Sequence, residues 1–261
     1  MSDLGVAVVI EDDLDMRNLL VGVLRQSGFE VHTASDGREG VAAVREIRPD
    51  VVTLDVGLPD IDGFEVLRRI RQFSNAYVVM LTGRTEEPDL LEALQAGADD
   101  YITKPFRPRE LRARMAAMLR RPRPQTLDTT AAVSPSEPLP PEAGVGESVF
   151  RHNGLALDYR RRTAAVGGKG VELTRSEFDL LHELLRASGA VLSRAELVRA
   201  ARGEYYREDA YISDSDERAV EVHIGNLRRK LGDNPESPLW LQTVRGAGYR
   251  LASPSTPGGS A

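Results

Sequence analysis

Four short apolar runs in the first half of the chain each end in a polar residue. Unbroken apolar runs are typical of strands buried on both faces, as in parallel sheets. Ligands of open parallel sheets bind beyond the carboxyl ends of the strands. The pattern therefore predicts one sheet edge that gathers carboxylates, a hydroxyl and an ammonium group, a set suited to a divalent cation and a phosphoryl group. The runs are residues 6–10, followed by Glu11 and Asp12; 51–54, followed by Asp55; 77–81, followed by Thr82; and 101–103, followed by Lys104.

Composition limits the class of protein. Of the 261 residues, 41% are hydrophobic, enough for buried cores, and the length allows one or two domains. The chain has no cysteine, so disulfides and thiolate metal sites are excluded. The N-terminus lacks the basic start and apolar run of a signal peptide, and no apolar stretch approaches the roughly 20 residues that span a bilayer. We therefore expect a soluble, cytoplasmic protein without membrane association.

A segment rich in proline and serine divides the chain. Residues 122–148 lack hydrophobic periodicity, which is typical of a flexible linker, and residues 253–261 have the composition of a disordered tail. The predicted domains are therefore 1–121 and 149–252. Net charge is −5 over 1–121, −3 over the linker and +2 over 149–261. This weak basic excess does not by itself indicate nucleic-acid binding.

The two predicted domains differ in class. In the first, five strands alternate with helices near 14–27, 37–47, 63–72, 88–95 and 108–119, which predicts a doubly wound α/β domain with a parallel sheet. The second has short strands at 155–157 and 164–166, then two capping-box patterns, Thr174 with Glu177 and Ser193 with Glu196. A third helix from about Asp216 to Leu231 and a hairpin at 241–244 and 249–251 follow. This α+β pattern suggests a winged helix.

The first domain resembles the receiver domain of bacterial two-component response regulators over nearly all of residues 5–121. The resemblance rests on Glu-Asp-Asp at 11–13, Asp55, Leu-Pro-Asp-x-Asp-Gly at 58–63, Thr82-Gly83 and Lys-Pro-Phe at 104–106. It implies a flavodoxin-like five-stranded parallel sheet. It also implies that Asp55 is the nucleophile that a sensor histidine kinase phosphorylates.

The resemblance also implies roles for the other residues of this edge. Glu11, Asp12, Asp55 and the Gly57 carbonyl would hold Mg²⁺, an ion that prefers oxygen ligands. Lys104, with a cis bond to Pro105, would offset phosphoryl charge. Thr82 would donate a hydrogen bond to the phosphoryl group, and Tyr101 would be the aromatic that turns inward on activation.

In the same family an activated receiver dimerises through one face. Here that face would carry Leu91, Leu94 and Ala113 as apolar contacts and Asp99, Asp100, Glu110 and Arg114 as ion pairs. Leu90 departs from the pattern, because that position commonly carries a basic partner for Glu110. Surface ion pairs contribute only about 0–1 kcal/mol each, so we still expect a homodimer.

The second domain resembles the winged-helix effector domain of the OmpR/PhoB family. The resemblance rests on residues 173–181, 218–231 and 242–251. Val220, Ile224, Leu227 and Leu231 form an apolar stripe on the third helix, and the other face, which we expect to be exposed, suits the major groove of double-stranded DNA. Gly225 and Asn226 stand where basic residues are common. The implied DNA contacts are Arg218, His223, Asn226, Arg228 and Arg229 on the helix and Thr243 and Arg245 on the wing.

These resemblances predict a phosphorylation-controlled transcription regulator that binds direct-repeat half-sites and is not an enzyme. The loop at 203–216 is in a region that contacts RNA polymerase in some members, a hypothesis that replacement of Tyr205 and Tyr206 would test. One alternative is an Mg²⁺-dependent phosphatase of the haloacid-dehalogenase type. Such enzymes usually carry an acid two residues after the nucleophile, where this chain has Gly57. The other alternative is a regulator that works without phosphorylation.

Overall fold

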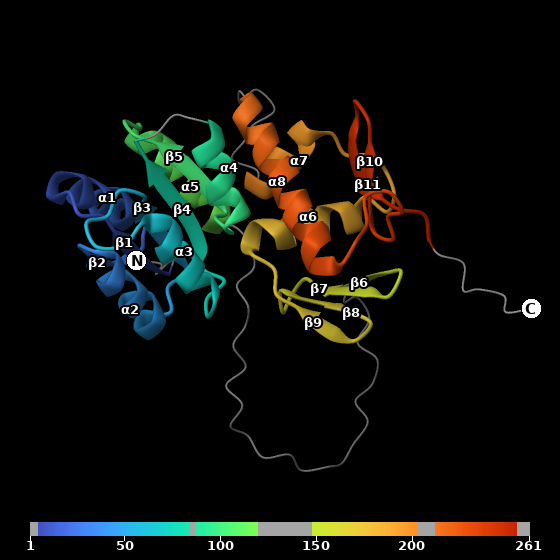
Figure 1. The fold of residues 1–261 in the computed structure, drawn as a ribbon, viewed down its shortest axis with the longest axis horizontal. Coiled ribbons are helices and arrows are strands. Elements are labelled where there is room, and N and C mark those ends of the chain that lie inside the picture. The colour runs from blue at the N-terminus through green and yellow to red at the C-terminus, as the bar shows by residue number, and fades with distance from the viewer. Residues whose placement is uncertain (1–4, 84–86, 120–147, 203–211, 255–261) are drawn as a thin grey trace, which may run out of the picture.

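The N-terminal part of the computed structural model is a parallel sheet between two helical layers (Figure 1). The structure describes residues 5–83, 87–119, 148–202 and 212–254, without the side chains of 87–90, 110, 113, 116–119 and 202. All four strand pairings in this sheet are parallel, and its order is β2-β1-β3-β4-β5. The strands are β1 (Val6–Ile10), β2 (Glu30–Ala34), β3 (Val51–Asp55), β4 (Tyr77–Thr82) and β5 (Asp100–Thr103).

Helices cover both faces of this sheet, as the doubly wound prediction required. On one face, α1 and α5 bury side chains such as Leu24 and Met115 against β1, β3 and β4. On the other, α2, α3 and α4 bury Val44, Leu67 and Leu94. The helices are α1 (Leu14–Gln26), α2 (Gly37–Ile47), α3 (Gly63–Arg71), α4 (Glu87–Gln95) and α5 (Pro108–Leu119).

Local sequence accounts for where several of these helices begin. Asp13, Asp36 and Asp62 are the N-caps of α1, α2 and α3, and each side chain accepts a hydrogen bond from a backbone N–H of the first turn. Gly63 then begins α3 directly beneath the end of β3. A Cβ atom at this position would collide with the backbone of Asp55 and Val56. Only glycine therefore lets α3 approach the strand that ends in Asp55.

The C-terminal part combines three helices with two antiparallel sheets. The helices share one core with the four-stranded sheet and with the terminal hairpin. Val220, Ile224, Leu227 and Leu231 all lie in this core, which confirms the predicted apolar stripe. The elements are β6 (Val149–His152), β7 (Leu155–Asp158), β8 (Thr163–Val166), β9 (Lys169–Val171), α6 (Arg175–Arg186), α7 (Arg194–Arg202), α8 (Asp214–Leu231), β10 (Leu241–Val244) and β11 (Gly248–Leu251).

Two local predictions need correction. Strands β6 and β9 have no counterpart in the sequence-based prediction, because β6 is only half-buried and β9 is a three-residue exposed edge containing glycine. Neither shows the alternation that marks a strand. In addition, Asp214 and Ser215 belong to α8 rather than to the preceding loop. Ser213 caps that helix in a reciprocal capping box with Asp216. Residues 203–211 of that loop lie outside the described part of the chain.

The two parts pack against each other through α8. Figure 1 places α8 beside α4. Ala219 and Val222 of α8 join the hydrophobic cluster that contains Leu94 and Tyr101 of the first domain. Helix α7 also contacts α5. Among the described helices, none is long and apolar enough to span a membrane.

Replacing Gly63 tests the close approach of α3 to β3. Gly63→Ala forces a Cβ into the backbone of Asp55, so we expect a loss of about 1–3 kcal/mol in the free energy of unfolding. The matched control is Gly22→Ala in α1, where nothing lies within 4 Å of the added Cβ. Alanine at a helical position should there stabilise by up to about 1 kcal/mol. Urea denaturation of both variants measures this difference, and equal effects would contradict it.

Candidate functional site: an acidic phosphoryl site and a covered recognition helix

The polar ends of the parallel strands meet at one edge of the sheet. Glu11 follows β1, Asp55 and Thr82 end β3 and β4, and Lys104 follows β5. The Lys104 Nζ atom lies 2.8 Å from Asp55 Oδ1 and 2.8 Å from Glu11 Oε2. One carboxylate oxygen from each of Glu11, Asp12 and Asp55 lies within 4.8 Å of the others. The convergence predicted from the four apolar runs is thus present.

Burial makes it unfavourable for the carboxylates of this cluster to be charged. Glu11 is 1% exposed and Asp55 6%, so each carboxylate has lost most of its hydration. Burial raises the pKa of Glu11, against the hydrogen bond from Lys104, which lowers it. For Lys104, burial opposes the charged form, but hydrogen bonds to Asp55 and Glu11 outweigh it and raise the pKa. Lys104 is therefore a fixed cation that partly neutralises the acids.

Backbone contacts hold the acids in place. Arg17, on the first turns of α1, donates hydrogen bonds from Nη1 to the carbonyl oxygens of Glu11 (2.6 Å) and Asp12 (3.1 Å). The N–H of Gly57 donates to Asp55 Oδ2 at 3.2 Å. The bond between Lys104 and Pro105 is cis, as expected. Arg17 was not predicted as a site residue, because nothing in its spacing distinguishes it from an ordinary surface arginine.

The donor set at this edge fits Mg²⁺. The available ligand groups are hard carboxylate oxygens. Asp12 is exposed, so a bound ion would face solvent on that side, which suits an ion that keeps several of its own water ligands. A bound divalent cation would neutralise the mutual repulsion of the three carboxylates. Glu11, Asp12 and Asp55 are the residues that would hold it.

The face predicted to form dimers is covered by α8. Leu94, Asp99 and Asp100 are buried, and Leu91 lines a cleft of about 640 Å³ between α4 and α8. Within the chain, Asp99 pairs with Arg71 and Asp100 pairs with Arg114, each at 2.6 Å. The side chains of Leu90, Glu110 and Ala113 lie outside the described residues.

Tyr101 connects this face to α8. The ring belongs to β5, is 7% exposed and packs in the core of the first domain. Its hydroxyl forms a hydrogen bond with the Ser215 side chain at the start of α8. Burial is the largest influence on the Tyr101 hydroxyl and raises its pKa. The predicted switch residue therefore contacts the predicted DNA-recognition helix directly.

The predicted DNA-binding residues fall into exposed and buried sets. Arg218, Arg229, Thr243 and Arg245 are exposed, and the half-buried Arg228 donates to Leu241 O and Thr243 Oγ1. His223 and Asn226 are instead buried at 3% and 4% exposure. The expectation that these two side chains would be exposed is therefore wrong for this conformation. The sequence could not show it, because the covering surface belongs to another domain.

Direct hydrogen bonds join α8 to the first domain. Asn226 donates from Nδ2 to Leu94 O at 2.9 Å, and His223 Nε2 lies 3.2 Å from Asp99 O. The Asp99 carboxylate also accepts from the backbone N–H of Ser176, in the first turn of α6, at 2.9 Å. An ion pair at 3.4 Å between Arg175 and Asp50 lies nearby. Ser176, Arg175 and Asp50 have no sequence signal for this role, because their partners are far away in the chain.

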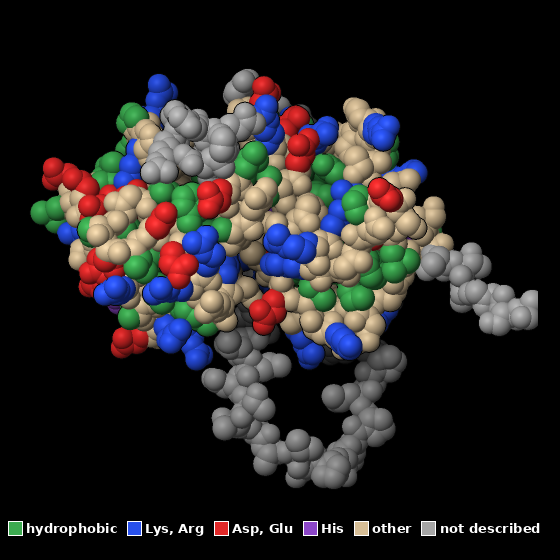
Figure 2. All heavy atoms as spheres, viewed as in Figure 1, with side chains coloured by type: hydrophobic (Ala, Val, Ile, Leu, Met, Phe, Trp, Pro, Cys, Tyr) green, Lys and Arg blue, Asp and Glu red, His purple; other side chains and the backbone are tan. Residues whose placement is uncertain are grey.

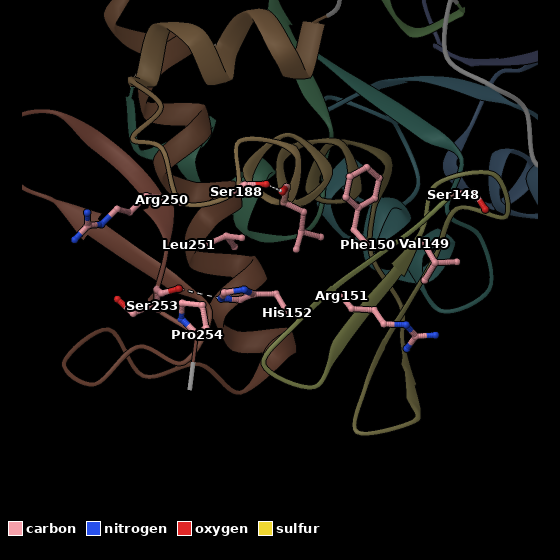
Figure 3. A pocket seen from close by; sticks show the side chains of 13 residues that line it. Ser148, Val149, Phe150, Arg151, His152, Ser188, Arg250, Leu251, Ser253 and Pro254 are labelled. Atoms are coloured by element: carbon pink, nitrogen blue, oxygen red, sulfur yellow. Dashed lines mark hydrogen bonds between the residues drawn. The ribbon is translucent and has the colours of Figure 1, made fainter. Parts of the chain in front are cut away.

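Two other surface features carry no site. A cavity of about 830 Å³ beside β6 and β11 contains none of the predicted residues (Figure 3). Its polar side chains have local partners, such as His152 with Ala252 O and Arg250 with Gln242. The face in Figure 2 mixes basic and acidic side chains rather than separating them. This face therefore has no broad basic surface among the side chains that Figure 2 colours.

The α/β domain with its acidic edge and the helical domain with its wing define a response regulator of transcription. The response regulator receiver domain model matches residues 7–116, and the model for the C-terminal domain of transcriptional regulatory proteins matches residues 168–251. The chain belongs to the OmpR/PhoB family of response regulators. That family consists of DNA-binding regulators and is not a class of enzymes.

Relatives match along nearly the full chain. The transcriptional regulatory protein AfsQ1 of Streptomyces coelicolor is 38% identical, with 95% of this chain and 98% of that protein covered. The DNA-binding response regulator MtrA of Mycobacterium tuberculosis is 37% identical, with 95% and 96% covered. A solved structure of a RitR mutant has a TM-score of 0.66 at 22% identity, covering 95% of this chain and 99% of that one, and shows the shared fold.

Mg²⁺ should stabilise the folded protein. An ion that binds only the folded state adds about 2.7 kcal/mol when its concentration is a hundred times the Kd. We expect calorimetry to show a rise in the unfolding midpoint for the wild type that is largely lost in Asp12→Asn. Asp15→Asn is the matched control, because Asp15 is an exposed acid in the first turn of α1, close to Asp12 in the chain but outside the cluster. An undiminished Mg²⁺ effect in Asp12→Asn would contradict the assignment.

Proposed function

We propose that a sensor histidine kinase controls this regulator by transferring a phosphoryl group to Asp55. One observation carries the assignment: within the acidic cluster, Asp55 contacts the fixed cation Lys104 at 2.8 Å through Oδ1 and also accepts the N–H of Gly57 through Oδ2. A carboxylate oxygen of Asp55 attacks phosphorus, the P–N bond of the phosphohistidine breaks, and the histidine nitrogen keeps the electron pair and takes up a proton. The product is an aspartyl phosphate.

The neighbouring residues support this step. Lys104 is charged and already lies against Asp55 Oδ1, so it can follow the growing charge on the phosphoryl oxygens. The N–H of Gly57 orients Asp55 through the other carboxylate oxygen. Thr82 lies at the neighbouring strand end and can donate a hydrogen bond to a phosphoryl oxygen. Mg²⁺ held by Glu11, Asp12 and Asp55 would supply further charge neutralisation.

Phosphorylation would act on DNA binding through α8. In the structure, α8 covers β5 and α4, and its His223 and Asn226 side chains are turned toward the receiver. When only a fraction of molecules is open, the apparent affinity for DNA is the intrinsic affinity multiplied by that fraction. We propose that a phosphoryl group on Asp55 draws Thr82 inward and repositions Tyr101, which weakens the hydrogen bond to Ser215. Released α8 then enters the major groove of a direct-repeat operator, with the wing beside it.

The released receiver face would then be available to a second copy of the chain. Leu91, Leu94 and Asp100 are in the predicted dimer face and also at or near the α8 contact. One surface cannot hold α8 and a partner receiver at once, so docking and dimerisation compete. This competition supports a closed monomer and an open dimer as the two states. A contact of residues 203–211 with RNA polymerase falls outside the described residues and stays a prediction.

A phosphatase is the weaker reading of the acidic site. The position two residues after Asp55 is Gly57, which has no side chain to protonate a leaving group. We therefore expect no steady turnover of phosphate monoesters. A burst limited to one phosphate per protein molecule would fit the regulator, whereas many turnovers would favour the phosphatase.

The central test compares wild type with Asp55→Ala, each with Mg²⁺ and with or without beryllofluoride as a phosphoryl mimic. We expect the mimic to shift only the wild type from monomer to dimer in analytical ultracentrifugation. It should also tighten only the wild type on an operator selected from random DNA, by tenfold or more. Identical behaviour of the two proteins would show that Asp55 is not the control point.

The hydroxyl of Tyr101 should help to hold the closed form. Tyr101→Phe removes its hydrogen bond to Ser215, a contact worth about 1 kcal/mol, or roughly a fivefold change in the docking equilibrium. Unphosphorylated Tyr101→Phe should therefore bind the selected operator up to about fivefold more tightly than the wild type. Tyr159→Phe, outside the interface, is the control. A Tyr101→Phe protein that binds no more tightly than this control would refute the coupling.

A further inference from the structure

His223 has an unusual environment for a residue on a DNA-recognition helix. It is 3% exposed and lies between α8, α6 and the receiver strand β5. Its only hydrogen bond among the described residues joins Nε2 to the Asp99 carbonyl oxygen at 3.2 Å, so Nε2 carries the proton. The other ring nitrogen, Nδ1, is buried and has no hydrogen-bond partner in the described structure. The ring is therefore accommodated as a neutral imidazole.

The acids near His223 are already committed to other groups. On the receiver, Asp99 pairs with Arg71 and Asp100 pairs with Arg114. On the effector domain, Glu177 of α6 forms an ion pair with Lys230 at 2.6 Å, and Asp216 of α8 accepts the N–H of Ser213. The remaining titratable neighbour is Tyr77 of β4, which also has a partner.

The space beside His223 is too small to hydrate a charged ring fully. The cavity beside His223 measures about 20 Å³, which is room for about one water molecule. A second N–H on the ring would find no acceptor among the described residues, and the new charge would be buried at a domain interface. Burying a charge without a dedicated partner is strongly unfavourable.

We propose that the contact between α8 and the receiver is a proton-sensitive latch, with His223 as the sensor, so that acidification releases the recognition helix without phosphorylation. This inference goes beyond the proposed phosphoryl switch and does not depend on Asp55. It gives the regulator a second input, the proton concentration of its surroundings. It also assigns His223 a role in the closed state in addition to any contact with DNA.

The direction of the pH effect depends on whether the docked or the released form of the protein binds a proton on His223 more tightly. Burial is the largest influence on His223 and lowers its pKa from the ordinary 6.5, despite the nearby acids, which raise it. The released form therefore binds the proton more tightly than the docked form. The docked form has its full stability above about pH 6.5 and loses it progressively as the pH falls from there toward this lowered pKa. For a docked ring that stays neutral, lowering the pH from 7.5 to 5.5 reduces the docking equilibrium constant about tenfold.

The other histidines do not share this environment. His32 is on β2, at the opposite edge of the sheet from β5. Its side chain is 40% exposed and lies beside Glu30. His152 hydrogen-bonds Ala252 O, and His182 stacks on Tyr159, both within the effector domain. Among the four histidines of the chain, His223 is the one whose ring contacts the receiver from α8.

The test measures the separation of the domains directly, because protonated His223 could also strengthen DNA contacts by itself. The chain lacks cysteine, so Glu46→Cys on α2 and Ser253→Cys after β11, both exposed, accept a pair of pH-insensitive dyes for energy transfer. Full-length protein carrying Asp55→Ala is titrated from pH 7.5 to 5.5. This background prevents phosphorylation, so failure of the phosphoryl proposal would not affect the result.

We expect energy transfer to fall with pH in this protein and in the control His32→Gln, with a shift of up to about tenfold in the closed-to-open ratio. His223→Gln keeps an N–H donor but cannot take up a proton, and should show no such transition. Glu11 and the other acids are the same in every variant, so their titration contributes equally to each pH response and cancels in the comparison between variants. His223→Lys should be open already at pH 7.5, with circular dichroism showing that both domains are folded. An identical pH response in His223→Gln and wild type, or none in either, would overturn the proposal.

Discussion

The buried carboxylate of Asp99 is the contact on which the arrangement of the two domains depends. A buried charge persists only when it is paired and hydrogen-bonded, and Asp99 satisfies this with groups from both domains. Arg71 and the N–H of Val78 bind it from the receiver side. The N–H of Ser176 binds it from the first turn of α6, a site that favours an anion. The Asp99 carbonyl then meets His223, so one residue fixes α6 and α8 against β5.

This arrangement makes α8 a helix with three different faces. Val220, Ile224 and Leu227 pack into the effector core, Ala219 and Val222 pack into the receiver cluster, and exposed residues such as Arg218 face solvent. The residues of α8 that dock on the receiver, His223 and Asn226, are among those predicted to contact DNA. In our proposal docking on the receiver and binding to DNA exclude each other, so a change that weakens docking raises the apparent affinity for DNA, by up to the same factor. Phosphorylation and protonation are, in our proposals, two such changes acting at different residues.

The acidic edge and the interface are joined by β5. Lys104 follows this strand and contacts Asp55, while Tyr101, three residues earlier, contacts Ser215 of α8. A short stretch of chain therefore connects the acidic edge to α8. At the acidic edge, Arg17 holds the backbone carbonyl of Glu11 and the N–H of Gly57 holds Asp55 Oδ2.

The sequence by itself determined both domain folds, the strand ends that form the acidic edge and the apolar stripe of α8. These features follow from the spacing of apolar residues along the chain and from the geometry of parallel sheets. Both are local rules that hold whatever the rest of the sequence is. It did not reveal β9, Arg17 as a clamp on the acidic loop, or the burial of His223 and Asn226. Only the tertiary structure decided these, because a side chain's exposure depends on surfaces brought together from distant parts of the chain. For Asn226 the covering group is the Leu94 carbonyl, 132 residues away, and no local pattern encodes a contact of that range.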